Sequence, residues 1–133
     1  MVVYDTYAWI EYFLGTSKGA QVKKLLDKGG YTPSIVLAEI SRKYLREGAS
    51  LETVKKRLIF IEAKSRIVEI TVEIAIKAAE KYLELLQHAK KTGERQPSLA
   101  DAVVYATALH LGTELVTGDR LFKFLPHVVY IGD

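Results

Sequence analysis

Residues 98–119, SLADAVVYATALHLGTELVTGD, contain the pattern that decides the fold. Ser98 precedes an alanine-rich helical stretch that ends at Gly112, and the short apolar segment 114–116 has the character of a buried strand. Thr117, Gly118 and Asp119 follow that strand directly. A helix leading into a short buried strand is typical of folds in which helices alternate with parallel strands.

The rest of the chain continues this alternation. We predict strands at 2–4, 31–32, 67–70 and 128–131, helices at 7–14, 19–28, 34–47, 50–63 and 72–87, a polar loop at 88–98 and a helical turn at 120–125. Ser34 is expected to cap its helix. The pattern therefore predicts a single domain over residues 1–133, a three-layer α/β/α sandwich around a short, mainly parallel sheet of about five strands.

Composition excludes several classes of site. The chain of 133 residues has no cysteine, which excludes disulfides, thiolate nucleophiles and cysteine-ligated metals. It also lacks a basic leader and any run of about twenty apolar residues, so we expect a soluble, cytoplasmic protein without a membrane span. Asparagine is absent and methionine occurs only at position 1, a composition typical of thermophile proteins.

Four acidic residues stand out in a chain that is otherwise basic: Asp5, Glu39, Asp101 and Asp119. The net charge is +3, and without these four acids 19 basic residues would face 12 acidic ones. Asp5 and Asp119 follow predicted strands, and in open parallel sheets ligands bind beyond the carboxyl ends of the strands. An acidic pocket on a basic protein favours a metal-dependent enzyme that acts on nucleic acid.

Each acid also has a purely structural explanation. Asp101 fits a capping box with Ser98, and Asp5 and Asp119 could each cap the helix that follows. Glu39 lies beside an apolar helix face, where Arg42 or Lys43 could pair with it. If the four instead converge, their mutual repulsion requires a compensating cation, and Mg²⁺ or Mn²⁺ prefers carboxylate oxygen.

Other chemistries find no matching motif. The three histidines, at 88, 110 and 127, lack the spacing of metal ligands, and the sequence has no GxGxxG, GxxxxGK[ST] or GxSxG motif.

The chain resembles PIN-domain ribonucleases in four blocks that span nearly its whole length: VVYDTYAWIEYF, PSIVLAEI, SLADAVVYATALHLG and ELVTGDRLF. In size it is similar to the VapC-type toxins of prokaryotic toxin–antitoxin pairs. The resemblance implies that Asp5, Glu39, Asp101 and Asp119 surround one or two Mg²⁺ or Mn²⁺ ions that activate water to cleave RNA. It further implies that Thr117 orients a ligating carboxylate, that the protein forms a homodimer, and that a cognate antitoxin binds across a groove near the early helices.

One position departs from the family pattern. Members commonly carry a small hydroxyl residue two positions after the first aspartate, where this chain has Tyr7. Thr6 keeps a hydroxyl, which we expect on the opposite face if the strand continues. Tyr7 could stack on a base or belong to the core.

The candidate RNA contacts are basic residues near the acids, namely Lys90, Lys91, Arg95 and Arg120, for which the alternative is an ordinary solvated surface.

Two other functions stay open from the sequence. A catalytically weak PIN-fold module that binds RNA or protein is one alternative, and Tyr7 favours it. A phosphoreceiver-like domain is the other, although it requires paired acids after the first strand, where this chain has Asp5-Thr6-Tyr7.

Overall fold

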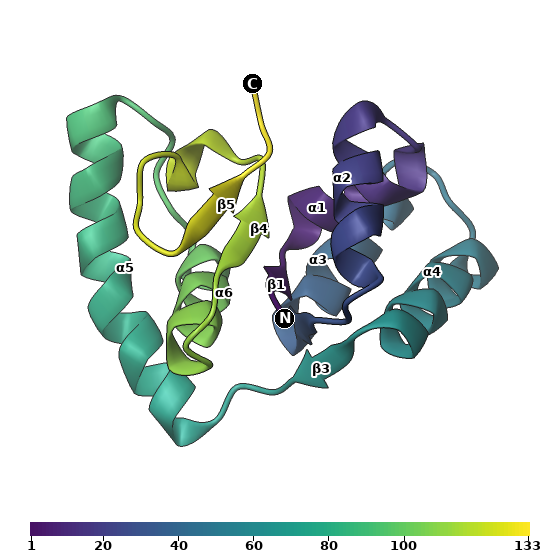
Figure 1. The fold of residues 1–133 in the computed structure, drawn as a ribbon, viewed down its shortest axis with the longest axis horizontal. Coiled ribbons are helices and arrows are strands. Elements are labelled where there is room, and N and C mark those ends of the chain that lie inside the picture. Colours follow the sequence, from purple (N-terminus) through teal and green to yellow (C-terminus); the bar gives the residue numbers. More distant parts are fainter.

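The computed structural model, which describes all residues 1–133, is built on a five-stranded sheet with helices on both sides (Figure 1). The strands are β1 (Val3–Tyr4), β2 (Tyr31–Pro33), β3 (Arg66–Val68), β4 (Leu115–Thr117) and β5 (Val128–Tyr130). The helices are α1 (Thr6–Leu14), α2 (Ser17–Leu26), α3 (Ser34–Arg46), α4 (Leu51–Lys64), α5 (Val72–Thr92) and α6 (Leu99–His110), followed by a short 3₁₀ helix, η1 (Arg120–Phe122).

The sheet order is β3-β2-β1-β4-β5, and every neighbouring pair is parallel. The predicted α/β architecture is therefore confirmed. Because β1 is central, the chain builds one half of the sheet outward to β3 and then returns to build the other half from β4. The carboxyl ends of β1 and β4 thus lie side by side at the point where the direction of winding changes, which is where ligands bind in open α/β sheets.

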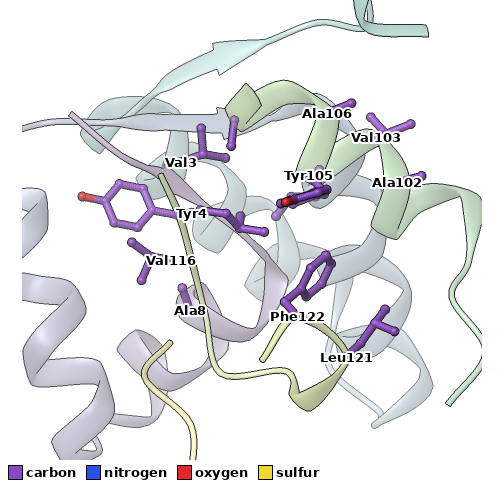
Figure 2. Close-up of a cluster of buried hydrophobic side chains, with 14 of the residues drawn as sticks. Val3, Tyr4, Ala8, Ala102, Val103, Tyr105, Ala106, Val116, Leu121 and Phe122 are labelled. Atoms are coloured by element: carbon purple, nitrogen blue, oxygen red, sulfur yellow. The ribbon is translucent and has the colours of Figure 1, made fainter. Parts of the chain in front are cut away.

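The core explains why the stretch 98–119 is decisive. Residues 102–108 of α6 are buried without interruption, so this helix is covered on all sides. Its side chains meet Val3 and Tyr4 of β1, Val116 of β4, and Leu121 and Phe122 of η1 (Figure 2). Small residues, Ala102, Ala106 and Ala108, allow close packing there. Asp101 and Asp119 are fixed by this packing, because they flank the buried segments.

A second part of the core is aromatic. Trp9 of α1 is fully buried, and its ring lies 5.7 Å from that of Tyr4 and 5.8 Å from that of Phe13, measured between centroids. Its indole Nε1 donates to Thr32 Oγ1 of β2 at 3.0 Å. Trp9 therefore joins α1, the helix that Asp5 caps, to β2.

The structure corrects three local predictions. Helix α5 continues to Thr92 and ends at Gly93, which has a φ of 74°, so the predicted loop begins five residues later than expected. Ser34 is the first residue of α3 and makes no capping hydrogen bond; Pro33 occupies the cap position. Strand β3 begins at Arg66 and ends at Val68. None of the helices has the length and apolar character that crossing a membrane requires.

Candidate active site

All four predicted acids line one cleft of about 380 Å³. Asp5 caps α1 directly after β1, and Asp119 caps η1 two residues after the end of β4. Glu39 reaches the cleft from α3, and Asp101 reaches it from the first turn of α6. The structural explanations for three of the acids are also confirmed, since these carboxylates cap helices and face the same cleft.

Asp5 is the most deeply buried of the acids, with 6% of its surface exposed. Its Oδ1 accepts a hydrogen bond from the backbone N–H of Ala8 at 2.9 Å. Burial raises the pKa of Asp5 to about 7, and repulsion from Asp119 and Glu39 adds to this effect. A buried carboxylate poised near neutral pH lacks a compensating cation.

Thr117 lies fully buried beside Asp5. Its hydroxyl oxygen accepts from the backbone N–H of Asp119 at 3.0 Å, and the nearby hydroxyl lowers the pKa of Asp5 in opposition to burial. The Thr117 hydroxyl thus interacts both with the Asp5 carboxylate after β1 and with the turn after β4. This position agrees with an orienting role for Thr117.

Glu39 has a partner that the sequence did not predict. Thr6 Oγ1 donates to Glu39 Oε1 at 2.8 Å, because the chain is already helical at Thr6 and its hydroxyl turns into the cleft. The condition under which Thr6 would face away from the site, a strand that continues through it, is therefore not met. Neither Arg42 nor Lys43 forms an ion pair with Glu39; Lys43 pairs with Glu47 at 2.7 Å. Burial raises the pKa of Glu39, and Asp101 contributes by repulsion.

Asp101 and Asp119 share one cation, Arg95. The guanidinium of Arg95 donates to both oxygens of Asp101, at 2.8 and 3.1 Å, and to Asp119 Oδ2 at 2.5 Å. Ser98 completes the predicted capping box, with its backbone N–H donating to Asp101 Oδ2 at 2.7 Å. Arg95, predicted to contact RNA, is thus tied to two acids of the site.

The donor set agrees in chemistry with a hard divalent cation. The four predicted carboxylates and that of Glu11 line one cleft, and Asp5 is buried without a positive partner. No group of three acidic or histidine side chains is arranged to hold an ion directly. Arg95 pairs with the carboxylates of Asp101 and Asp119, so two of the possible ligands are already engaged. The residue types therefore fit a hard cation, whereas their present positions do not form a site for one.

Tyr7, the residue that departs from the family pattern, fills space next to the acids. Its ring lies directly against Gly118, where an added methyl group would overlap the ring atoms. Its hydroxyl accepts from Lys18 Nζ at 3.2 Å. Tyr7 is half-buried and lines the cleft, so it is both a packing residue and part of the site wall.

We expect Gly118→Ala to lower the free energy of unfolding by about 1–3 kcal/mol, because the new methyl group overpacks against Tyr7. The destabilisation caused by Gly118→Ala should largely disappear when the substitution is made in the Tyr7→Ser variant, where the ring is absent. Urea denaturation of the two single variants and the double variant measures this coupling. If Gly118→Ala lowers the free energy of unfolding equally in the wild type and in the Tyr7→Ser variant, the Tyr7 ring does not press on Gly118.

The remaining candidate RNA contacts, Lys90, Lys91 and Arg120, are exposed and do not line the cleft. Lys90 and Lys91 are exposed on the last turn of α5, on the helix and not in a loop. Arg120 is 72% exposed and pairs with Glu94 at 3.3 Å. The sequence missed one residue that holds an acid in place, Thr6, which donates to Glu39. A hydroxyl directly after Asp5 was the available signal.

Comparison with protein-family models identifies the family of this chain. The model described as the PIN domain matches residues 2–127, which includes every residue of the cleft. The chain belongs to the PIN domain family. No curated protein matches this sequence.

Solved structures of PIN proteins share the fold over nearly the full length. A toxin–antitoxin complex from Klebsiella pneumoniae has a TM-score of 0.74 at 20% identity, covering 100% of this chain and 99% of that one. VapBC2 from Rickettsia felis, bound to a promoter DNA fragment, has a TM-score of 0.68 at 19% identity, with 98% and 97% covered. VapC20 from Mycobacterium tuberculosis, a toxin that cleaves the sarcin–ricin loop, has a TM-score of 0.65 at 19% identity, with 93% and 92% covered.

Proposed function

We propose that this PIN protein is an endoribonuclease that depends on Mg²⁺ or Mn²⁺ and acts as the toxin of a toxin–antitoxin pair. The observation that carries the proposal is the convergence of Asp5, Glu39, Asp101 and Asp119 in one cleft of a PIN fold. A site of this kind needs no covalent nucleophile. Solved structures with the same fold include toxins, one of which cleaves the sarcin–ricin loop.

Each side chain then has a defined task. Asp5, Asp101, Asp119 and Glu39 would hold the cation, which supplies Lewis-acid activation of water and charge stabilisation at the phosphodiester. Thr117 fixes the orientation of Asp5, and Thr6 fixes that of Glu39 through its 2.8 Å hydrogen bond. The exposed cations Lys90, Lys91 and Arg120 would attract the phosphates of RNA.

The proposed partner is an antitoxin protein. Several solved structures of this fold are toxin–antitoxin complexes. Here Leu45 and Ile59 are exposed on the α3–α4 hairpin, at 45% and 53%. A groove lined by Tyr12, Phe13 and Phe60 lies alongside on α1 and α4. An apolar helix of a partner would fit such a surface.

The proposal is tested by RNA cleavage with purified protein in Mn²⁺ and in EDTA, using Glu39→Gln and Asp101→Asn as site variants. We expect cleavage that requires metal and falls on the order of 10²-fold or more in each variant, because each loses one carboxylate of the cation site. Glu80→Gln is the matched control, since Glu80 is exposed on α5 and does not line the cleft. Metal-independent cleavage, or full activity in both site variants, would refute the proposal.

One observation favours a second candidate, a PIN-fold module that binds RNA without cutting it. Arg95 already neutralises part of the charge on Asp101 and Asp119, as a structural ion pair would. In that case the wild type would bind RNA equally well in Mn²⁺ and in EDTA and leave it intact.

A further inference from the structure

Arg95 is the one cation that directly contacts the carboxylates of the site. Its side chain is 47% exposed, whereas the side chains of Asp101 and Asp119 are 12% and 26% exposed. The guanidinium therefore covers the carboxylates from the solvent side. Lys43 also lines the cleft, but it is paired with Glu47.

Two ion pairs join the segment that carries Arg95 to residues 119–120. Glu94 pairs with Arg120 at 3.3 Å, and Arg95 pairs with Asp119 at 2.5 Å. In both places an acid precedes an arginine, so the two ion pairs cross each other. Gly93 ends α5 on one side, and Ser98 caps α6 on the other, so the short connection between the helices presents Arg95 to the acids.

We propose that Arg95 is an internal counter-ion that a divalent cation must displace, so that Arg95 weakens metal binding and is released when metal binds. This inference rests on the proposed metal-dependent function. Both oxygens of Asp101 and one oxygen of Asp119 are engaged by Arg95, and these oxygens are the groups that a metal would take. One cation cannot compensate four carboxylates, which leaves the site able to exchange Arg95 for an ion of higher charge.

Release has a consequence for the substrate. The freed guanidinium stays at the wall of the cleft, because residues 93–98 are held by helices on both sides. A guanidinium binds phosphate through paired hydrogen bonds in the same way as it binds a carboxylate. Metal binding would therefore convert Arg95 from a ligand of the acids into a contact for the RNA backbone.

The test is Mn²⁺ affinity measured by calorimetry for the wild type, Arg95→Gln and Arg46→Gln. Arg46 is the matched control, because it is exposed in the last turn of α3 and does not line the cleft. We expect Arg95→Gln to bind Mn²⁺ about tenfold more tightly, a change of about 1.4 kcal/mol. Arg46→Gln should stay within about twofold of the wild type.

A second measurement requires no variant. Mg²⁺ titration of the wild type, followed by NMR of the arginine side chains, should move the guanidinium signals of Arg95 to those of a free arginine while those of Arg46 stay in place. If wild type and Arg95→Gln bind the metal equally and the Arg95 signals do not move, the inference is overturned and the proposed nuclease function stands. If neither protein binds Mn²⁺ or Mg²⁺, the inference and the metal-dependent function both fail.

Discussion

Asp5→Asn is expected to abolish RNA cleavage, with a loss on the order of 10²- to 10³-fold. Asparagine retains the carbonyl oxygen that accepts from Ala8, so the cap of α1 survives. The variant removes the negative charge that lies deepest in the cleft and that has no cation beside it. Cleavage in Mn²⁺ measures the effect, with Asp27→Asn on the exposed end of α2 as the matched control.

The same substitution should change how stability depends on pH. Burial raises the pKa of Asp5 from 3.8 to about 7, so the folded protein holds a proton that the unfolded chain loses above about pH 4. Wild-type stability in EDTA therefore falls as pH rises from about 4 to about 7. The asparagine side chain carries no charge, so the variant should equal the wild type at pH 4 and exceed it at pH 8 by on the order of 2–4 kcal/mol.

Metal should reverse this ranking. Mn²⁺ stabilises only a folded state that binds it, so at pH 8 the melting temperature of the wild type should rise with Mn²⁺ and that of Asp5→Asn should rise much less. An Asp5→Asn variant that cleaves RNA normally, or that has the same stability as the wild type at both pH values, would remove Asp5 from the proposed metal site.

Trp9→Ala is expected to be the most destabilising single substitution, with a loss of about 3–5 kcal/mol. Trp9 is fully buried among four aromatic rings, those of Tyr4, Tyr12, Phe13 and Phe60. A domain of this size has a total stability of about 5–15 kcal/mol, so the variant would lose a large share of it. Urea denaturation followed by far-ultraviolet circular dichroism measures the loss, because the chain has a single tryptophan and the variant lacks its fluorescence.

Trp9→Phe separates packing from hydrogen bonding. Phenylalanine keeps an aromatic ring but cannot donate to Thr32, whose hydroxyl keeps a second partner in Ser65 Oγ at 2.7 Å. We expect a loss of about 1–2 kcal/mol, well below that of the alanine variant. Equal losses in the two variants would show that the indole hydrogen bond, and not the aromatic packing, dominates at this position.

The regular parts of the fold were predictable from the sequence. The α6–β4 stretch is recognisable as an apolar helix, a glycine and a short strand, because continuous burial permits only such residues. The acids at the strand ends followed from the geometry of parallel sheets, which brings the carboxyl ends of all strands to one edge. Asp5 and Asp119 are placed by this rule alone.

The local contacts were not predictable, for physical reasons. Lys90 and Lys91 were assigned to a loop because polar residues carry no periodic signal, although they are good helix formers and extend α5. Thr6 was expected to face away only if strand alternation continued past Tyr4, whereas helical geometry already begins there. Arg95 was assigned to RNA because a sequence cannot reveal that residues 95, 101 and 119 meet in space.

The order of the strands divides the site between two parts of the chain. Residues before 69 contribute Asp5 and Glu39 together with β1, β2 and β3, and residues after 71 contribute Asp101 and Asp119 together with β4 and β5. Only the exposed residues 69–71 connect the two parts covalently, and the β1–β4 pairing joins them in the sheet. Neither part holds a complete acidic site, so activity would report whether the two parts are assembled. A chain cut at 69–71 would have all four carboxylates in one cleft only while its two fragments remain bound to each other.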